Sequence, residues 1–304
     1  MSEPIHRLRQ VAGGAVPDSA DDPVRITFTG VAETLLAPLY ARALDARSPH
    51  PLLADLAAAE LVARTDYEFG RLGINETNAV GVALRTLWFD RQVRRFLAAH
   101  PAATVVHLGC GLDDRYTRLG PGPRVAWYDL DRPEVIDLHR RVHPEHPRRH
   151  TLAASVTDPD WPERIPTDRP VLVVAEGLSM YLKAEEGPRA LRRIVARFPY
   201  GELVLDTYSR FAVGSTRRFA LFRRTGAQLA WGVDHPRELP AQVAGLRLVG
   251  SVSAYGTAKG VDLSGLPAKL RARMLVDTQI MARLPVLGSV GHLSRHSFGV
   301  PRRG

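Results

Sequence analysis

Two glycines and a pair of carboxylates lie where a nucleotide-type ligand could be held. Gly109 and Gly111 follow an apolar run at residues 104–108, and a second apolar run that begins at Val125 ends in Asp129 and Asp131. Glycine lets the backbone approach a ligand closely, and a carboxylate at the end of the next strand accepts hydrogen bonds from ribose hydroxyls. The spacing predicts a ligand that lies across the carboxyl ends of two neighbouring parallel strands.

The glycine pattern favours S-adenosylmethionine over a nicotinamide dinucleotide. The third glycine of a dinucleotide fingerprint is missing, and Asp114 occupies its place. That third glycine normally permits the close helix packing that seats a pyrophosphate. Asp129 and Asp131 alternate along one strand and must face opposite sides. We therefore expect Asp131 to reach the ribose and Asp129 to position the loop.

A carboxylate and an arginine elsewhere could hold an amino-acid moiety. Glu176 follows the wholly apolar run 171–175, where a buried carboxylate is costly unless it is paired or hydrated. An ammonium group would be a suitable partner for it. Arg85 lies among apolar helix positions and could present two N–H groups to a carboxylate. Without such a ligand, Arg85 would be interpreted as part of a structural salt bridge, and Glu176 as a helix N-cap neighbour or a surface acid.

The segment after the third predicted strand is a candidate adenine site. Ser155 and Val156 combine a small polar group with an apolar side chain, which suits the amino edge and the face of an adenine ring. Without the neighbouring motifs this segment would be interpreted as an ordinary loop.

Other chemistries find less support. The histidines include no HExxH spacing, and Cys110 is the single cysteine, so no thiolate zinc cluster is expected and no metal is predicted. No nucleophile elbow of the GxSxG type and no phosphate-binding P-loop occurs. His107, inside an apolar run, is interpreted as a hydrogen-bonded core histidine.

The hydrophobic periodicity predicts an α/β fold in which strands alternate with helices. Fully apolar strands such as residues 171–175 are typical of a parallel sheet covered on both faces. The predicted strands are 104–108, 124–130, 150–154, 171–175, 202–207, 246–255 and 292–299. The predicted helices are 34–47, 52–64, 79–99, 133–142, 185–198, 216–225 and 268–281.

The order of these elements suggests one integrated unit with three parts. Residues 1–24 are polar, contain proline and glycine, and are expected to form a flexible tail. Residues 25–100 precede the first strand of the sheet and should form a helical cap. Residues 101–304 should form the ligand-binding α/β domain.

Composition limits the possible partners and compartments. The net charge of +9 comes almost wholly from arginine, and the arginines are scattered rather than gathered into a patch with interleaved aromatics. Nucleic acid is therefore not an expected partner. The sequence shows no apolar run of membrane-spanning length and no secretory signal pattern. A cytoplasmic protein is expected, since a single cysteine suits a reducing compartment. The oligomeric state is left open.

Several motifs occur in an order that resembles the leucine carboxyl methyltransferase family, and most closely its bacterial polyketide (tetracenomycin-type) branch of carboxyl O-methyltransferases. The resemblance extends from about Ile26 to Phe298. The motifs that carry it are FTGVAETLL (28–36), RTLWFD (85–90), HLGCGLDDR (107–115), WYDLDRPEVI (127–136), EGLSMYL (176–182) and LVLDTYS (203–209).

The resemblance implies a class I methyltransferase, that is, a Rossmann-like and mostly parallel sheet with a helical N-terminal cap and S-adenosylmethionine as its cofactor. It implies that Arg85 holds the methionine carboxylate, Gly109 forms the backbone turn, Asp131 binds the ribose and Glu176 binds the methionine amino group. The family's Asp-Leu pair at the adenine is replaced here by Ser155-Val156, and Asp114 stands where its glycine motif more often has threonine.

The function expected from this resemblance is methyl-ester formation on a carboxylate of a small, acidic, polyketide-like acceptor. A carboxylate with a pKa of about 4 is ionised at neutral pH and needs no general base, which agrees with the absence of an evident acid/base pair. An acidic acceptor needs cations or hydrogen-bond donors around it. The candidates for these donors are Tyr40, Arg42, Tyr181, Tyr208 and Arg210.

Four alternatives remain open from the residues alone. A hydroxyl acceptor has a pKa of about 10 as a phenol and would usually require activation by a base. The chain could instead bind the cofactor without turnover, as a sensor or assembly partner. A nicotinamide oxidoreductase is disfavoured by Asp114. An RNA methyltransferase is disfavoured because the sequence lacks both a basic patch and an Asn/Asp-Pro-Pro-aromatic motif.

Overall fold

A seven-stranded sheet forms the centre of the molecule. The computed structural model describes residues 23–216, 220–284 and 287–300. Strand order across the sheet is β5-β4-β3-β6-β7-β9-β8, and the first five of these strands are parallel. β9 lies antiparallel between β7 and β8. The strands are β3 (Thr104–Leu108), β4 (Ala126–Asp131), β5 (Arg149–Ala153), β6 (Val171–Ala175), β7 (Tyr200–Tyr208), β8 (Arg247–Ser253) and β9 (Gly291–Gly299).

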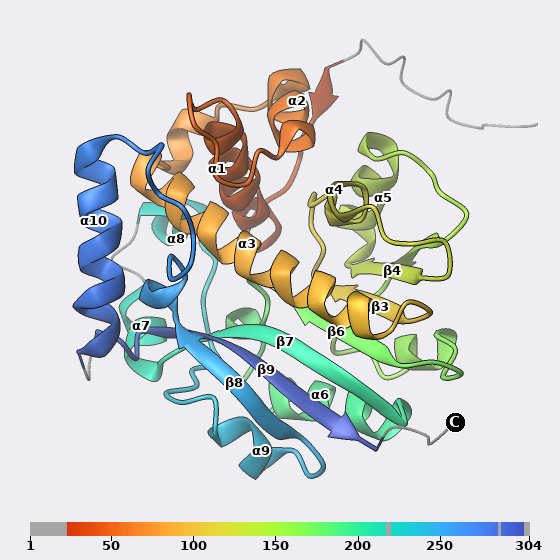
Figure 1. The fold of residues 1–304 in the computed structure, drawn as a ribbon. Helices are drawn as coiled ribbons and strands as arrows, with labels where there is room; N and C mark the ends of the chain where they lie inside the picture. The colour runs from red at the N-terminus through yellow and green to blue at the C-terminus, as the bar shows by residue number, and fades with distance from the viewer. Residues whose placement is uncertain (1–22, 217–219, 285–286, 301–304) are drawn as a thin grey trace, which may run out of the picture.

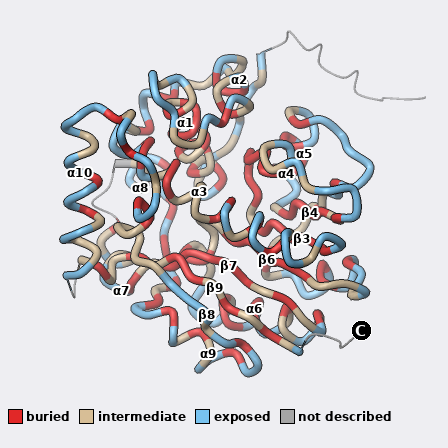
Figure 2. Tube along the Cα trace, viewed as in Figure 1, coloured by how far each residue is buried: buried red, intermediate tan, exposed pale blue. Residues whose placement is uncertain are grey.

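The two central strands are apolar because both of their faces are covered. Every residue of β3 and β6 is buried, as expected for the middle of a parallel sheet. One face packs against α6 (Glu186–Arg197), with Ile194 at the contact, and the other packs against Phe89 and Phe96 of α3 (Glu76–Ala99). Figure 1 shows α3 crossing the sheet, and Figure 2 shows buried stretches along the neighbouring strands β7 and β9.

The N-terminal cap is a small helical layer with its own apolar cluster. It contains β1 (Val24–Arg25), η1 (Ala32–Leu35), α1 (Leu36–Ala46), α2 (Leu56–Arg64), β2 (Thr65–Asp66) and η2 (Phe69–Leu72). Leu36, Leu39, Leu61 and Phe69 are buried together, and Leu112 from the loop after β3 joins them. The cap is thereby packed directly onto the glycine loop.

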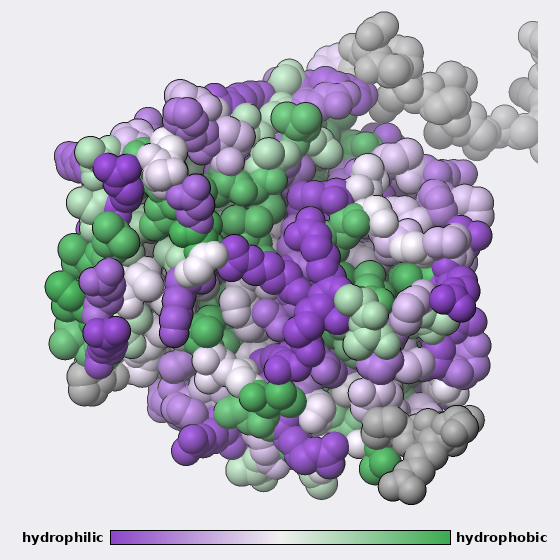
Figure 3. Space-filling model, in the orientation of Figure 1, coloured by the Kyte–Doolittle hydropathy of each residue, from purple (hydrophilic) through white to green (hydrophobic). Residues whose placement is uncertain are grey.

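The other helices that the structure describes lie around the sheet. They are α4 (Arg115–Leu119), α5 (Pro133–Val142), η3 (Trp161–Arg164), η4 (Ser179–Tyr181), α7 (Arg210–Ser215), α8 (Ala220–Thr225), α9 (Glu238–Gln242), η6 (Ala254–Gly256), α10 (Ala268–Gln279) and η7 (Met281–Arg283). Met274 of α10 and Leu84 of α3 belong to one apolar cluster. Leu275 and Val276 of α10, and Ile280 directly after it, are exposed. Figure 3 shows apolar residues gathered on the side of the molecule where Figure 1 places α10.

The predicted fold class is confirmed, and the element boundaries differ for local reasons. Helix α2 begins at Leu56 rather than at residue 52, because the N–H groups of residues 52–54 donate to the carboxylate of Asp45 instead of joining a helix. Helix α3 begins at Glu76 rather than at residue 79, because Asn75 and Asn78 form a reciprocal cap.

Other differences concern short helices and the undescribed residues. Helices α4, α7 and α9 have five or six residues, too few for an apolar periodicity to mark them. Of the helix expected over 216–225, the part at 217–219 lies outside the described residues. The tail expected at 1–24 does so up to residue 22, and Val24 pairs with Thr65.

Candidate active site

A cavity of about 1000 Å³ opens at the carboxyl ends of the parallel strands. This volume is at the upper end of the range for small-molecule sites, so it can hold a cofactor and part of a second ligand. Two regions of its lining can be distinguished, and N-terminal residues between 31 and 42 and between 74 and 84 line it as well. The strand-end half comprises Arg85, the loop 109–113, Asp131, residues 154–157 and Glu176, and the C-terminal half comprises the lining residues from 180–182, 208–229, 254–258, 273–278 and 290–293.

The glycine loop after β3 has a conformation that other residues adopt with strain. Gly109 and Gly111 have φ values of 62° and 56°, in the left-handed region that glycine enters without cost. A Cβ on Gly109 would lie 3.0 Å from Cδ1 of Leu178. The Gly111 carbonyl oxygen lies 2.8 Å from Nδ1 of His139, so α5 also holds the loop.

Asp131 lies against this loop at the end of β4. Its carboxylate accepts hydrogen bonds from the N–H groups of Gly111 and Arg132, both at 2.8 Å. Burial raises the pKa of Asp131 above its ordinary value. Asp131 lines the cavity and Asp129 does not, since Asp129 faces the other side and accepts hydrogen bonds from Trp127 and Arg149.

The adenine candidates also line the strand-end half. Ser155 donates its N–H to Asp158, and its hydroxyl lies 2.8 Å from that of Thr157, so the turn is held by its own side chains. The side chain of Val156 is part of the apolar cluster under the sheet. The segment therefore offers the hydroxyls of Ser155 and Thr157 beside the apolar side chain of Val156.

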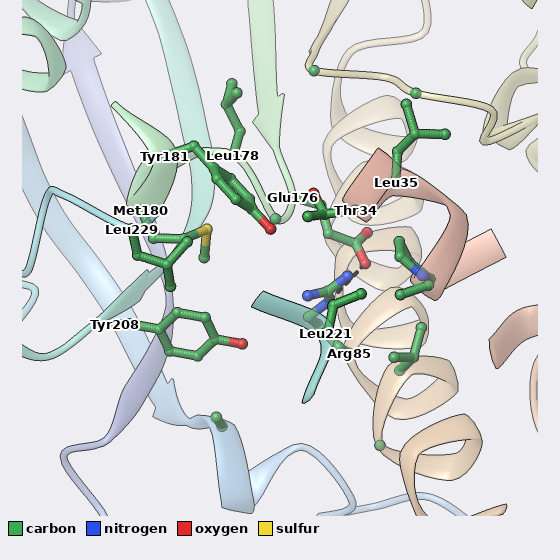
Figure 4. Close-up of a pocket in the computed structure, with 18 of the residues that line it drawn as sticks. Thr34, Leu35, Arg85, Glu176, Leu178, Met180, Tyr181, Tyr208, Leu221 and Leu229 are labelled. Atoms are coloured by element: carbon green, nitrogen blue, oxygen red, sulfur yellow. Dashed lines mark hydrogen bonds and ion pairs between the residues drawn. The ribbon is translucent and has the colours of Figure 1, made fainter. Parts of the chain in front are cut away.

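Arg85 and Glu176 meet at the centre of the cavity, although they are far apart in the sequence. Nε of Arg85 donates to Oε1 of Glu176 at 2.9 Å, and the Thr86 hydroxyl donates to the same oxygen at 2.9 Å. The Arg85 side chain is 21% exposed and that of Glu176 8%, so Arg85 retains access to the cavity (Figure 4). Arg85 therefore forms a salt bridge, the alternative left open from the sequence, and its partner is Glu176, the second residue expected to hold the amino-acid moiety.

Arg115 is a central residue that the sequence reasoning missed. It is fully buried, donates to Asp90 at 2.8 Å, and is hydrogen-bonded to the second oxygen of Glu176. Burial by itself would raise the pKa of Glu176, but Arg115 and Arg85 lower it to about 2. Nη1 of Arg115 also lies 3.0 Å from Nε2 of His107, which confirms His107 as a hydrogen-bonded core histidine. Its place at the end of the motif LDDR was the sequence signal that could have marked Arg115 as a site residue.

Three of the five proposed acceptor-side residues line the cavity, namely Tyr181, Tyr208 and Arg42. In Figure 4 the rings of Tyr181 and Tyr208 enter from one side, with their hydroxyls directed toward Arg85 and Glu176. Burial raises the pKa of Tyr181 to about 12 and raises the pKa of Tyr208. Both phenols therefore remain protonated hydrogen-bond donors at neutral pH.

Two further acceptor candidates lie outside the cavity lining. Tyr40 lies outside the cavity lining and stacks on Phe69 in the cap. Arg210 is also outside the lining, on the surface, where it pairs with Asp234 and Glu238. These positions do not support the expectation that Tyr40 and Arg210 contact an acceptor.

Arg42 occupies an intermediate position. It touches the cavity, but its side chain is buried and its Nε donates to Asp55 at 2.8 Å. Its contacts with the Leu112 carbonyl and with Asp113 bind the cap to the glycine loop. Arg42 therefore supports the loop and does not present a free cation to a ligand.

The C-terminal half has a mainly apolar lining, most of which lies outside the motifs of the sequence. Short helices and loops contribute it, so its residues come together only in the folded chain. Its apolar and aromatic members include Met180, Phe211, Phe222, Leu229, Tyr255 and Met274.

Comparison with known proteins decides the family. The sequence model of the leucine carboxyl methyltransferase family matches residues 36–195, which include the glycine loop, Asp131 and Glu176. The chain belongs to the leucine carboxyl methyltransferase family. It is an S-adenosylmethionine-dependent O-methyltransferase.

Individual relatives agree with this assignment. The chain is 44% identical to the tetracenomycin polyketide synthesis O-methyltransferase TcmP of Streptomyces glaucescens, over 73% of this chain and 82% of the relative. It is 38% identical to the S-adenosyl-L-methionine-dependent methyltransferase dpfgK of Gibberella zeae, over 74% and 83%. A protein from Thermobifida fusca, solved as a candidate methyltransferase, shares the fold with a TM-score of 0.56 at 17% identity, over 93% of this chain and 97% of that one.

Two further observations concern membranes and metals. Among the described residues, no helix is both long and apolar enough to cross a membrane. Within the same ranges, no group of three or more histidine, cysteine, aspartate or glutamate side chains is arranged to hold a metal ion.

Proposed function

We propose that this methyltransferase forms a methyl ester on a carboxylate of a small, acidic, polyketide-like acceptor. The observation that carries the proposal is the state of the acids in the cavity. Each acidic side chain lining it within the described ranges is already engaged by a cation or by backbone N–H groups. These acids are Asp113, Asp131, Glu176, Glu186 and Asp277.

This observation distinguishes between two classes of acceptor. A carboxylate is ionised at neutral pH and can attack without losing a proton, whereas a phenol with a pKa of about 10 would need one removed. Carboxylate oxygens that already accept hydrogen bonds or pair with a cation have fewer lone pairs free to take a proton from a phenol. The cavity is therefore better suited to a nucleophile that arrives already charged.

The strand-end half fits the cofactor. We assign Arg85 to its carboxylate and Glu176 to its ammonium, because the two side chains meet at the cavity and carry the complementary charges. Asp131 would accept from the ribose, Gly109 and Gly111 would form the backbone turn, and Ser155 and Val156 would flank the adenine. S-adenosylmethionine supplies a methyl group on a positively charged sulfur, which departs as a neutral thioether when the acceptor oxygen bonds to that carbon.

The C-terminal half would orient the acceptor and exclude water. The hydroxyls of Tyr181 and Tyr208 would donate to the acceptor carboxylate, and Phe222 and Leu229 would enclose its apolar body. Catalysis would then depend on alignment rather than on proton transfer. The name of the Streptomyces relative, which concerns polyketide synthesis, supports an acceptor of that chemical type.

A labelling experiment tests the proposal. Purified protein is incubated with methyl-labelled S-adenosylmethionine and naphthalene carboxylic acids, with the matching naphthols as control acceptors. We expect label in an alkali-labile product from the acids only, because methyl esters hydrolyse in base and aryl methyl ethers do not. Alkali-stable product from the naphthols alone would overturn the carboxylate assignment.

A further inference from the structure

Asp206 is a buried carboxylate just behind the cavity, at the end of β7. It does not line the cavity, and its side chain is 4% exposed. Oδ1 accepts a hydrogen bond from the N–H of Gly177 at 2.8 Å, and Oδ2 lies 3.6 Å from Nη1 of Arg85. The methyl-transfer mechanism proposed above gives this acid no role.

Both partners of Asp206 are neighbours of Glu176: Arg85 is bonded to it, and Gly177 follows it in the chain. Arg85 is bonded to Glu176 through Nε and directs Nη1 toward Asp206, so one guanidinium is shared between two carboxylates. Gly177 follows Glu176 in the chain with a φ of 67°, a turn that the hydrogen bond to Asp206 stabilises. Asp206 thus contacts both components of the pair that we assign to the methionine moiety.

Binding of the cofactor changes the charge balance at this guanidinium. The methionine carboxylate would approach Arg85, which already faces the charges of Glu176 and Asp206. Glu176 retains Arg115 as a second cationic partner, but Asp206 has only Arg85 within ion-pairing distance among the described residues. Two carboxylates next to one guanidinium repel each other, and a proton on the buried one removes that repulsion.

We propose that Asp206 is a positioning residue for Arg85 and that it takes up a proton when the amino-acid carboxylate of the cofactor binds. This inference rests on the assignment of Arg85 and Glu176 made under the proposed function. Asp206 would thereby make cofactor affinity depend on pH, although it does not touch the cofactor.

The groups that face Asp206 allow its charge to be followed separately. They are Arg85 from α3, Glu176 after β6, Tyr181 from η4 and Tyr208 from β7 itself. Burial, with the charge of Glu176, raises the pKa of Asp206 to about 6. With the pKa of Glu176 at about 2 and that of Tyr181 at about 12, both keep one charge state between pH 6 and 8.

The direction of the pH effect follows from this pKa. Below about pH 6 Asp206 is protonated before and after binding, so affinity does not change with pH through this group. Above it, binding requires proton uptake, and affinity falls by up to about tenfold per pH unit until the pKa of the complex is reached.

Calorimetry measures the proton directly. S-Adenosylhomocysteine is titrated at about pH 7 in buffers of different ionisation enthalpy, and the slope of heat against ionisation enthalpy gives the protons exchanged. We expect wild-type protein to take up a substantial fraction of one proton. Asp206→Asn, which keeps an acceptor for the Gly177 N–H, should take up none and show a flatter affinity between about pH 6 and 8.

A second ligand keeps the test independent of the variant. 5′-Methylthioadenosine lacks the amino-acid moiety and should bind wild-type protein without proton uptake. Tight binding of S-adenosylhomocysteine without uptake would overturn the role of Asp206 and leave the proposed function intact, and equal uptake in Asp206→Asn would overturn it too. Binding of neither ligand would contradict the cofactor assignments themselves.

Discussion

The strand-end half and the C-terminal half of the cavity are stabilised by different interactions. In the first, buried ions are paired through short contacts, as where Arg115 joins Asp90 and Glu176 under the glycine loop. In the second, apolar and aromatic side chains such as Phe222 and Leu229 come from short helices and loops. Paired ions fix distances and orientations, whereas apolar contacts fix mainly shape. A common cofactor can therefore be held rigidly while the acceptor region varies.

The largest effect that this difference predicts is on stability. Replacing Arg115 by methionine removes a fully buried cation from both Asp90 and Glu176, which then keep one arginine each, and should cost roughly 3–5 kcal/mol. Urea denaturation measures this loss. Arg95→Met is the matched control, since Arg95 pairs with Glu202 at the surface and should cost at most about 1 kcal/mol. Equal losses in both variants would contradict a special role for the buried network.

The next effect separates cofactor binding from backbone strain. Gly109→Ala and Gly120→Ala both place a side chain at positive φ, which should cost roughly 1–2 kcal/mol of stability each. Only Gly109 adjoins the cavity, and only there would the new Cβ meet another side chain within 4 Å. We expect Gly109→Ala alone to weaken S-adenosylhomocysteine binding by about tenfold or more, measured by calorimetry. A comparable loss in Gly120→Ala would show that strain and not the site is responsible.

A smaller effect is expected in the C-terminal half. Tyr181→Phe removes one neutral hydrogen-bond donor worth about 0.5–1.5 kcal/mol, so kcat/KM for a carboxylic acid acceptor should fall by up to about tenfold. Affinity for S-adenosylhomocysteine should change little. Tyr40→Phe provides the control, because Tyr40 stacks on Phe69 outside the lining. Unchanged acceptor kinetics in Tyr181→Phe would remove Tyr181 from the proposed acceptor contacts.

The smallest effect is expected at the surface. Arg210 is more than half exposed and pairs with Asp234 and Glu238, so Arg210→Met should cost less than about 1 kcal/mol. Acceptor KM should stay within about twofold of wild type. Steady-state kinetics measure this KM. A large rise in Arg210→Met would show that Arg210 contributes to acceptor binding although it lies outside the cavity lining.

The same division explains what could be predicted from the sequence. The strands could be predicted because they are apolar runs. Gly109, Asp131 and Glu176 could be predicted because they lie where such runs end, which places them at one edge of the sheet. Arg115 was missed because its partners Asp90 and Glu176 come from distant segments, and ion pairing over such separations leaves no periodic signal.

Residue type alone predicted the acceptor-side candidates, and only some of them lie at the cavity. Tyr181 and Tyr208 line the cavity, whereas Tyr40 and Arg210 do not. A tyrosine or arginine pairs as readily with a neighbouring ring or acid as with a ligand. Which one occurs depends on tertiary packing of short segments that carry no pattern of their own.

Titration of S-adenosylhomocysteine into wild-type protein and Asp131→Ala, with NAD in parallel, tests the central claim most directly. Asp131 is bound by the N–H groups of Gly111 and Arg132 at the edge of the cavity. We predict that wild-type protein binds S-adenosylhomocysteine and not NAD, and that Asp131→Ala weakens this binding at least tenfold, about 1.4 kcal/mol. Binding of NAD alone, or unchanged affinity in Asp131→Ala, would contradict the assignment of the strand-end half to the cofactor.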